Sequence, residues 1–240
     1  MNLTDKIKKQ ISDYCSINKD IETCVLILDN GQIVKCLNNK QNTNNFFKIA
    51  AQDYLLATKQ GKIVACFHSH VGDNDNFSLF DHINCKNHKI IFILYNVNSK
   101  IFKVLEPEKT LNFIGRDFNI ISANCYTLIQ DYYKEILNIE IPNVKVSSYD
   151  WTREWSFEKI EETGLAGGFQ KIENFKDLSN LKVHDVLIFN FNKGFVAHFS
   201  IYLGGSMFIH HPRNAMSHIQ SLDQTNMPYY VAAFRYKDLI

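Results

Sequence analysis

The stretch from Ile63 to Asp81 constrains the fold of this chain more than any other. Apolar residues lead into His68 and His70, which indicates a buried strand that ends there. Side chains alternate along a strand, so the two imidazoles point the same way. Ser78 and Asp81 stand three residues apart in a segment typical of the first turn of a helix, so they share one face. A strand, a loop and a helix are therefore expected to bring two histidines and a carboxylate together.

This set of side chains has the chemistry of a catalytic zinc site. Two neutral imidazoles and one carboxylate give three ligands, and an open fourth position distinguishes a catalytic zinc from a structural one. A general base is still needed to take a proton from the zinc-bound water. Glu22 is the candidate base, because it heads the fully apolar run 24–28, where a carboxylate without a purpose is costly.

Glu22, the His-Ser-His segment 68–70, Ser78 and Asp81 resemble, in this spacing, the motif of the JAMM (MPN) metalloproteases. The resemblance implies that Glu22 is the base, that the two histidines and the aspartate hold zinc, and that Ser78 helps to stabilise the oxyanion. A His-x-His pair alone is more often solvated or hydrogen-bonded than a ligand set, so the full pattern carries the assignment.

The loop between the histidines and the helix departs from that family. Proline commonly follows the second histidine, and Val71 stands here, which predicts a less rigid loop around intact ligands. The following polar run reads as a turn. Asp73 and Asp75 do not predict a calcium loop, because no bidentate glutamate follows at the required distance.

Composition limits the class of protein. The chain has 240 residues, 45% hydrophobic and 21% charged, which is ordinary for a soluble globular protein with two domains. Its net charge of +1 is mixed along the chain without a basic block, which argues against a nucleic-acid partner. No apolar run approaches about 18 residues, so neither a membrane span nor a signal peptide is expected. The six cysteines include no C-x-x-C pair and are expected to be free thiols.

A proline and a charge cluster at residues 106–110 separate two complete patterns of helices and strands. We therefore predict two domains, residues 1–108 and 111–240. The first is expected to be an α/β domain, a mixed sheet with helices. Its predicted helices are 3–15, 49–59 and the one that starts near Asp81, and its predicted strands are 24–28, 32–37, 63–70, 88–97 and 100–106.

The second domain is predicted to be α+β, a helix packed on an antiparallel sheet. Asn124 or Ser122 is expected to be the N-cap of a helix that carries Cys125 in its first turn. A helix N-terminus favours the thiolate, so we expect a lowered pKa for Cys125. The helical periodicity is that of Tyr126, Ile129, Tyr133 and Ile136, and strand-like runs follow at 183–191, 194–203 and 207–211.

His198 and His210 lie in the second and third of these runs, across a tight hairpin, so they can approach one another on one face of the sheet. A cysteine at a helix start, a strand histidine and a second polar group form a nucleophile, base and orienter arrangement. The alternative is a core cysteine with two cross-strand histidines. His211 competes with His210 for the orienting role, and strand alternation allows only one of them to point inward.

This half resembles the NlpC-type cysteine peptidases, whose fold is papain-like. The resemblance implies that Cys125 is the nucleophile, His198 the base and His210 the orienting residue. The sequence departs from that family at Asn124, where aspartate is common.

The order of the two halves resembles the tail assembly proteins of lambdoid and related siphophages. Besides the two sites, the specific pieces are 115–117, 124–129, 131–133, 201–204 and 208–211. The resemblance implies a phage or prophage tail-tip component, present in the host cytoplasm during assembly or at the virion tail tip. Its implied partners are other phage tail-tip proteins, and its implied substrate is a peptidoglycan stem peptide or a tail protein. Two alternatives are a structural tail-tip component with dispensable active sites and a cellular JAMM isopeptidase.

Overall fold

The structure is a computed structural model that describes all residues except 1–3, 18–19, 39–46, 143–155, 192–197 and 240. The chain divides into two compact units, Met1–Asn112 (unit 1) and Phe113–Ile240 (unit 2). Unit 1 therefore ends two residues after the cluster 106–110 that separates the two halves in the sequence.

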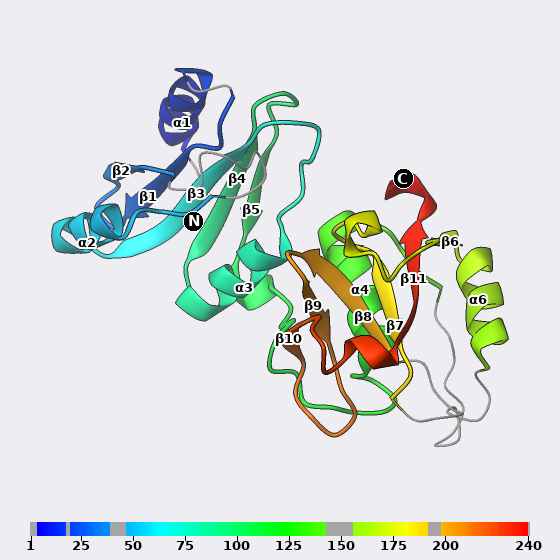
Figure 1. The fold of residues 1–240 in the computed structure, drawn as a ribbon. Helices are drawn as coiled ribbons and strands as arrows, with labels where there is room; N and C mark the ends of the chain where they lie inside the picture. The colour runs from blue at the N-terminus through cyan, green and yellow to red at the C-terminus, as the bar shows by residue number, and fades with distance from the viewer. Residues whose placement is uncertain (1–3, 18–19, 39–46, 143–155, 192–197, 240) are drawn as a thin grey trace. The chain divides into compact units, whose positions relative to one another are not determined.

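Unit 1 contains a five-stranded sheet with the strand order β2-β1-β3-β4-β5 (Figure 1). Strands β3 and β4 are parallel, and the other neighbouring strands are antiparallel. A parallel pair needs a crossover, which the helix α3 (Leu79–His88) provides. The strands are β1 (Cys24–Leu28), β2 (Ile33–Cys36), β3 (Ile63–His70), β4 (Ile91–Asn96) and β5 (Phe102–Leu105).

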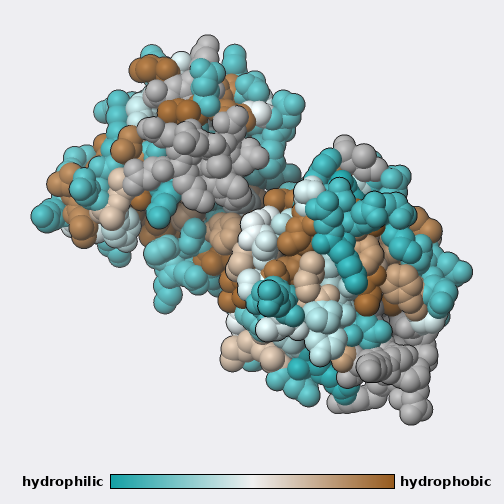
Figure 2. Space-filling view, in the orientation of Figure 1, coloured by the Kyte–Doolittle hydropathy of each residue, from teal (hydrophilic) through white to brown (hydrophobic). Residues whose placement is uncertain are grey.

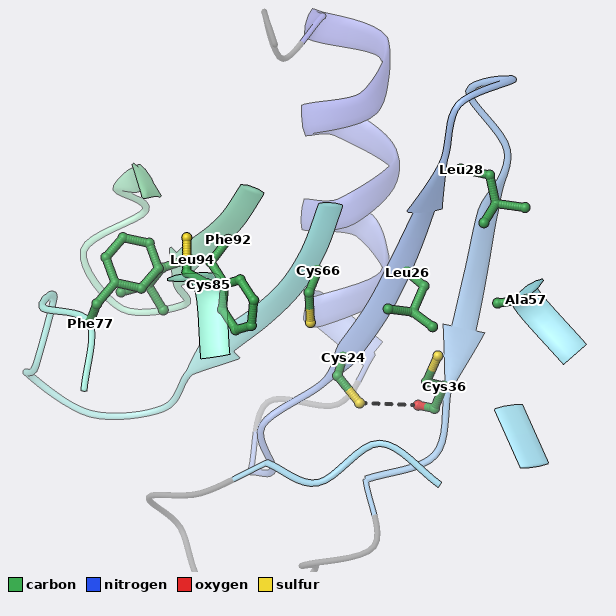
Figure 3. Close-up of a cluster of buried hydrophobic side chains, with 10 residues drawn as sticks. All are labelled: Cys24, Leu26, Leu28, Cys36, Ala57, Cys66, Phe77, Cys85, Phe92 and Leu94. Atoms are coloured by element: carbon green, nitrogen blue, oxygen red, sulfur yellow. Dashed lines mark hydrogen bonds between the residues drawn. The ribbon is translucent and has the colours of Figure 1, made fainter. Parts of the chain in front are cut away.

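Helices cover both faces of this sheet. On one face, Ile11 and Cys15 of α1 (Asp5–Ile17) pack with the odd-numbered residues of β1. On the other face, Ala57 of α2 (Ala51–Gln60) and Cys85 of α3 pack with the even-numbered ones (Figure 3). Since both faces of β1 are covered, every residue in it is apolar. The predicted mixed sheet with helices is confirmed.

The six cysteines are free and buried. Four of them lie in the cluster of Figure 3, where Cys24 Sγ donates to the carbonyl oxygen of Cys36 over 3.6 Å. They pack as small apolar side chains.

Unit 2 contains a six-stranded antiparallel sheet in the order β10-β9-β8-β7-β11-β6 (Figure 1). Helix α4 (Cys125–Leu137) packs on β8, and α6 (Phe157–Ala166) packs beside β6. The strands are β6 (Phe169–Lys171), β7 (Val186–Phe189), β8 (His198–Gly204), β9 (Met207–His210), β10 (His218–Ser221) and β11 (Tyr230–Tyr236). The predicted helix and three strands are present, although residues 194–197 lie outside the described part of the chain.

The sequence-based prediction missed β6, β10 and β11, and β10 becomes important below. In the view of Figure 2, hydrophobic residues form scattered patches among hydrophilic ones. Within the described residues, the helices are too short or too polar to cross a membrane.

Candidate functional sites

The register between β1 and β3 places Glu22 beside the two histidines. Cys24 pairs with His68, so continuing the antiparallel ladder by two residues sets Glu22 opposite His70. Hydrogen bonds between the residues next to them extend the pairing, because Ser69 N–H donates to the carbonyl of Thr23 and Thr23 N–H donates to Ser69 Oγ. Glu22 Oε1 consequently lies 3.9 Å from His70 Nε2.

His68, His70 and Asp81 come together at the end of β3 and the start of α3. Each offers one ligand atom, and these atoms all lie within 4.8 Å of one another. His68 Nε2 is 3.5 Å from Asp81 Oδ2. Ligands of a tetrahedral zinc at bond lengths near 2.1 Å are about 3.4 Å apart, so this spacing suits a zinc ion.

His68 gives the clearest indication of a metal-binding site. It is 1% exposed, and neither ring nitrogen has a hydrogen-bond partner within the part of the chain that the structure describes. The 3.5 Å separation from Asp81 is too long for a good hydrogen bond. Phe47 stacks on the imidazole with 4.4 Å between ring centroids. A buried imidazole without a partner is costly, and a bound metal ion would satisfy it.

The second histidine is oriented by the loop that follows it. The carbonyl oxygen of Asn74 lies 2.8 Å from His70 Nδ1, and because a carbonyl only accepts, Nδ1 carries the hydrogen and Nε2 keeps a lone pair. The amide of Asn96 holds the same loop by donating to the carbonyls of Gly72 and Asn74. The loop with Val71 is thus tied down by side-chain hydrogen bonds.

Ser78 and Asp81 form the capping box of α3. Ser78 N–H and Oγ–H both donate to Asp81 Oδ2, at 2.8 and 2.7 Å, and Asp81 N–H donates back to Ser78 Oγ. The hydroxyl hydrogen of Ser78 is therefore engaged in orienting the third predicted ligand. Its role at an oxyanion stays a prediction.

Burial and neighbouring charges set the protonation of the two acids. Burial raises the pKa of Glu22 to about 7, with Asp81 adding to the effect and His68 opposing it. Burial would also raise the pKa of Asp81, but His68 and the hydrogen bonds from Ser78 outweigh it and lower that pKa to about 2. The two carboxyl groups of this site thus have different pKa values: that of Glu22 suits an acid–base residue, and that of Asp81 suits an ionised metal ligand.

These residues line one end of a cavity of about 590 Å³. Its other walls are mostly apolar and come from the sheet, α2, α3 and the segment before α2. They include Phe47, Ile49, Tyr54, Leu55 and Phe80. A cavity of this kind can hold an apolar side chain of a bound peptide.

In unit 2, Asn124 caps α4 and Cys125 is its first residue. The Asn124 side chain accepts from the N–H groups of Tyr126 and Thr127, so the N-cap is Asn124. Cys125 is only 4% exposed, and burial raises the pKa of its thiol to about 11. The N–H groups of Phe199, Cys125 and Tyr126 act in the opposite direction but do not outweigh burial. The expected lowering of the Cys125 pKa is therefore wrong for this structure.

The two predicted histidines are in direct contact. His198 Nε2 lies 3.0 Å from His210 Nδ1. Ser200 pairs with His210, so His198 is the diagonal neighbour on the same face. Cys125 and His198 form no hydrogen bond with each other within the described residues; the backbone of Phe199, next to His198, acts to lower the pKa of the thiol.

His211 points elsewhere. Its ring meets Phe118 edge-on, with 5.6 Å between centroids, and it is fully buried. Of the two candidate orienting residues, the structure places His210 against His198.

A further histidine was missed by the sequence-based prediction. His218 Nε2 lies 2.9 Å from His210 Nε2, and the two residues pair directly between β10 and β9. Its signal is a histidine eight positions after His210, but only recognition of β10 would have brought it back to the site.

Comparison with known proteins assigns unit 2 to a family. The model of the NlpC/P60 family matches residues 113–235. The chain belongs to the NlpC/P60 family. This family consists of cysteine peptidases and related hydrolases.

Two curated relatives are both named Tail tip assembly protein K. The protein of Escherichia phage N15 is 21% identical over 193 residues, which cover 79% of this chain and 77% of the relative. The protein of Escherichia phage lambda is 29% identical over 167 residues, which cover 68% and 76%. Both matches are longer than unit 2, so each extends beyond the NlpC/P60 region into unit 1.

A solved NlpC/P60 family protein from Bacillus cereus is also similar. The match has a TM-score of 0.39 and 14% identity, and covers 93% of this chain and 66% of that protein.

Proposed function

We propose that the chain is a phage tail-tip assembly protein with two hydrolytic sites. Unit 2 is a cysteine peptidase that acts on the peptide stems of peptidoglycan or on a tail protein. Unit 1 is a JAMM-like zinc metallopeptidase that hydrolyses an amide bond. Other tail-tip proteins are its partners. The names of the two relatives support the tail-tip role, and the NlpC/P60 match supports the thiol chemistry.

The observation that carries the cysteine site is Cys125 at the N-terminus of α4 together with the bonded pair of His198 and His210. Cys125 Sγ attacks the amide carbonyl carbon, and its proton passes to His198. The N–H of Cys125, which unlike those of Tyr126 and Thr127 does not donate to the Asn124 side chain, would stabilise the developing oxyanion. The carbon–nitrogen bond then breaks, the leaving amine takes the proton from His198, and water hydrolyses the thioester.

The resting structure holds this site in a neutral form. Burial lowers the pKa of His198 to about 4, and nearby histidines add to that shift, while the Cys125 thiol has a raised pKa. Substrate must therefore bring the imidazole of His198 within hydrogen-bonding distance of Sγ, a tightening that is common when a Michaelis complex forms.

The observation that carries the metal site is the fully buried His68, which has no hydrogen-bond partner among the described residues and lies with His70 and Asp81. Zinc bound by these three residues would supply a Lewis acid and a water of lowered pKa. Glu22, whose carboxylate lies beside His70, would act as the general base. The adjoining apolar cavity positions the substrate peptide.

A test of the cysteine site uses purified sacculi and the release of new amino groups by the full chain, with His70→Ala in every protein to remove zinc chemistry. Cys125→Ala and His198→Ala should both abolish release. Cys85→Ala, which removes another buried thiol, should leave it intact. Equal release by the protein with and without Cys125 would contradict the proposal.

A second candidate function is a structural tail-tip component whose sites are dispensable. The absence of a hydrogen bond between Cys125 and His198 within the described residues favours it. Complementation separates the two: a Cys125→Ala, His70→Ala protein that restores full tail assembly and infection supports the structural role. A cellular JAMM isopeptidase, the other alternative, leaves unit 2 without a role.

A further inference from the structure

Three histidines of unit 2 form a continuous hydrogen-bonded row across three neighbouring strands. His198 on β8 contacts His210 on β9 at 3.0 Å, and His210 contacts His218 on β10 at 2.9 Å. The row ends on the backbone, where His218 Nδ1 lies 2.9 Å from the carbonyl oxygen of Met216. His218 itself is exposed.

The carbonyl at the end of the row determines where every hydrogen in it lies. A carbonyl oxygen only accepts, so His218 Nδ1 carries a hydrogen and, in a neutral ring, Nε2 is the acceptor. His210 must then donate from its Nε2, which leaves its Nδ1 as an acceptor. His198 in turn donates from Nε2, and its Nδ1 is left without a hydrogen.

These hydrogen positions hold when the rings of His198 and His210 are neutral. Burial lowers the pKa of His198 to about 4 and that of His210 to about 3, and neighbouring histidines strengthen both shifts. Each of these two rings therefore carries one hydrogen at neutral pH and can be a donor only on one side.

We infer that His218 is a positioning residue of the cysteine site, because its bond to the Met216 carbonyl fixes His198 in the tautomer with an unprotonated Nδ1. The inference rests on the proposed peptidase function, in which His198 takes the proton of Cys125. A ring that already carries a hydrogen on Nδ1 cannot accept that proton there. Without an acceptor at position 218, the row can reverse, with His210 donating from Nδ1 and His198 accepting at Nε2.

Two substitutions separate the acceptor from the bulk of the side chain. His218→Gln keeps an acceptor oxygen, whereas His218→Leu has none. Gln220→Leu makes a similar polar-to-apolar change two residues along β10, at a position that pairs with Phe208 and takes no part in the row of hydrogen bonds, and serves as the control. Because position 218 is exposed, these proteins are expected to fold like the wild type.

The first readout is the ring ¹⁵N chemical shifts of His198 in the full chain, assigned by their loss in His198→Asn. We expect a hydrogen on Nε2 and an unprotonated Nδ1 in the wild type, His218→Gln and Gln220→Leu. His218→Leu should show a mixture of tautomers or the reversed one. A wild-type His198 with a hydrogen on Nδ1, or a His218→Leu spectrum identical to wild type, overturns the inference.

The second readout is turnover of sacculi. His218→Leu should lower kcat by roughly 10- to 100-fold with KM unchanged, less than the approximately 10⁴-fold loss seen when the residue bonded directly to a catalytic histidine imposes the wrong tautomer. His218→Gln should recover most of that loss. If the tautomer changes but the wild type has no turnover, the positioning of His198 by His218 is upheld and the peptidase proposal fails. If turnover depends on Cys125 but the tautomers do not depend on position 218, the inference alone fails.

Discussion

Replacing His68 by leucine should have opposite effects on stability with and without zinc. In the metal-free chain both ring nitrogens of His68 are buried and lack partners within the described residues. An unsatisfied buried polar group costs about 1–3 kcal/mol, and leucine has a similar volume without that cost. Allowing for imperfect packing against Phe47 and Phe77, we expect metal-free His68→Leu to be more stable than wild type by about 1–2 kcal/mol.

Zinc should reverse this order. A ligand at 100 times its Kd stabilises the folded state by about 2.7 kcal/mol, and a site that has lost one of three ligands gains little of that. With zinc at 100 times its Kd the wild type should therefore exceed His68→Leu by about 0.7–1.7 kcal/mol. For a unit of this size each kcal/mol corresponds to about 4 °C in Tm, so the sign of the difference is measurable.

The assay is thermal unfolding of the full chain by calorimetry, with chelator and then with zinc. His88→Ala is the matched control, since His88 lies on α3 and lines the same cavity but is exposed and outside the ligand set. Its response to zinc should equal that of wild type. A His68→Leu protein that is less stable in both conditions would refute the reasoning and make His68 an ordinary core residue.

Three further predictions follow from the two sites and the connector. Glu22→Gln should bind as much zinc as wild type by metal analysis but lose roughly 10²–10⁴-fold of the zinc-dependent amide hydrolysis; loss of zinc would show that Glu22 is a ligand. Alkylation of Cys125 by iodoacetamide, followed by peptide mass spectrometry, should accelerate about tenfold per pH unit between about pH 6 and 9, because its raised pKa leaves little thiolate; a flat rate would indicate a preformed thiolate. Limited proteolysis should cut first at residues 111–112, since Pro107 and Thr110 are buried and their carbonyls accept from Lys86; a chain that yields no folded fragments would contradict two separable domains.

The grouping of His68, His70 and Asp81 could be predicted because its geometry is local. Alternation along one strand fixes His68 and His70, and a three-residue step at a helix start fixes Ser78 against Asp81. Glu22 could be predicted because a carboxylate at the head of an apolar strand is energetically costly. The β1–β3 register explains why it lies opposite His70. The contact between His198 and His210 was predictable for the same reason, because a tight hairpin joins their strands.

Two properties of the cysteine site depend on contacts that are distant in sequence. A helix N-terminus is visible in the sequence, and it does act to lower the pKa of Cys125, but the packing of α4 on β8 buries the thiol and raises that pKa. His218 reaches His210 only because β10 pairs with β9, and the short run His218–Ser221 has no apolar alternation that predicts a strand.

Both candidate sites fix the tautomer of a histidine through a backbone carbonyl in a loop. The carbonyl of Asn74 accepts from His70 Nδ1 and leaves Nε2 free for a metal ion. The carbonyl of Met216 accepts from His218 and, through His210, leaves Nδ1 of His198 free for a proton. A sequence motif cannot predict these carbonyls, because the backbone of any residue can supply a carbonyl oxygen. In unit 1 the loop carbonyls accept from the amide of Asn96, which explains how this loop keeps its conformation with Val71 in place of proline. The chemistry of each site therefore depends on the conformation of its loop as much as on the side chains of its motif.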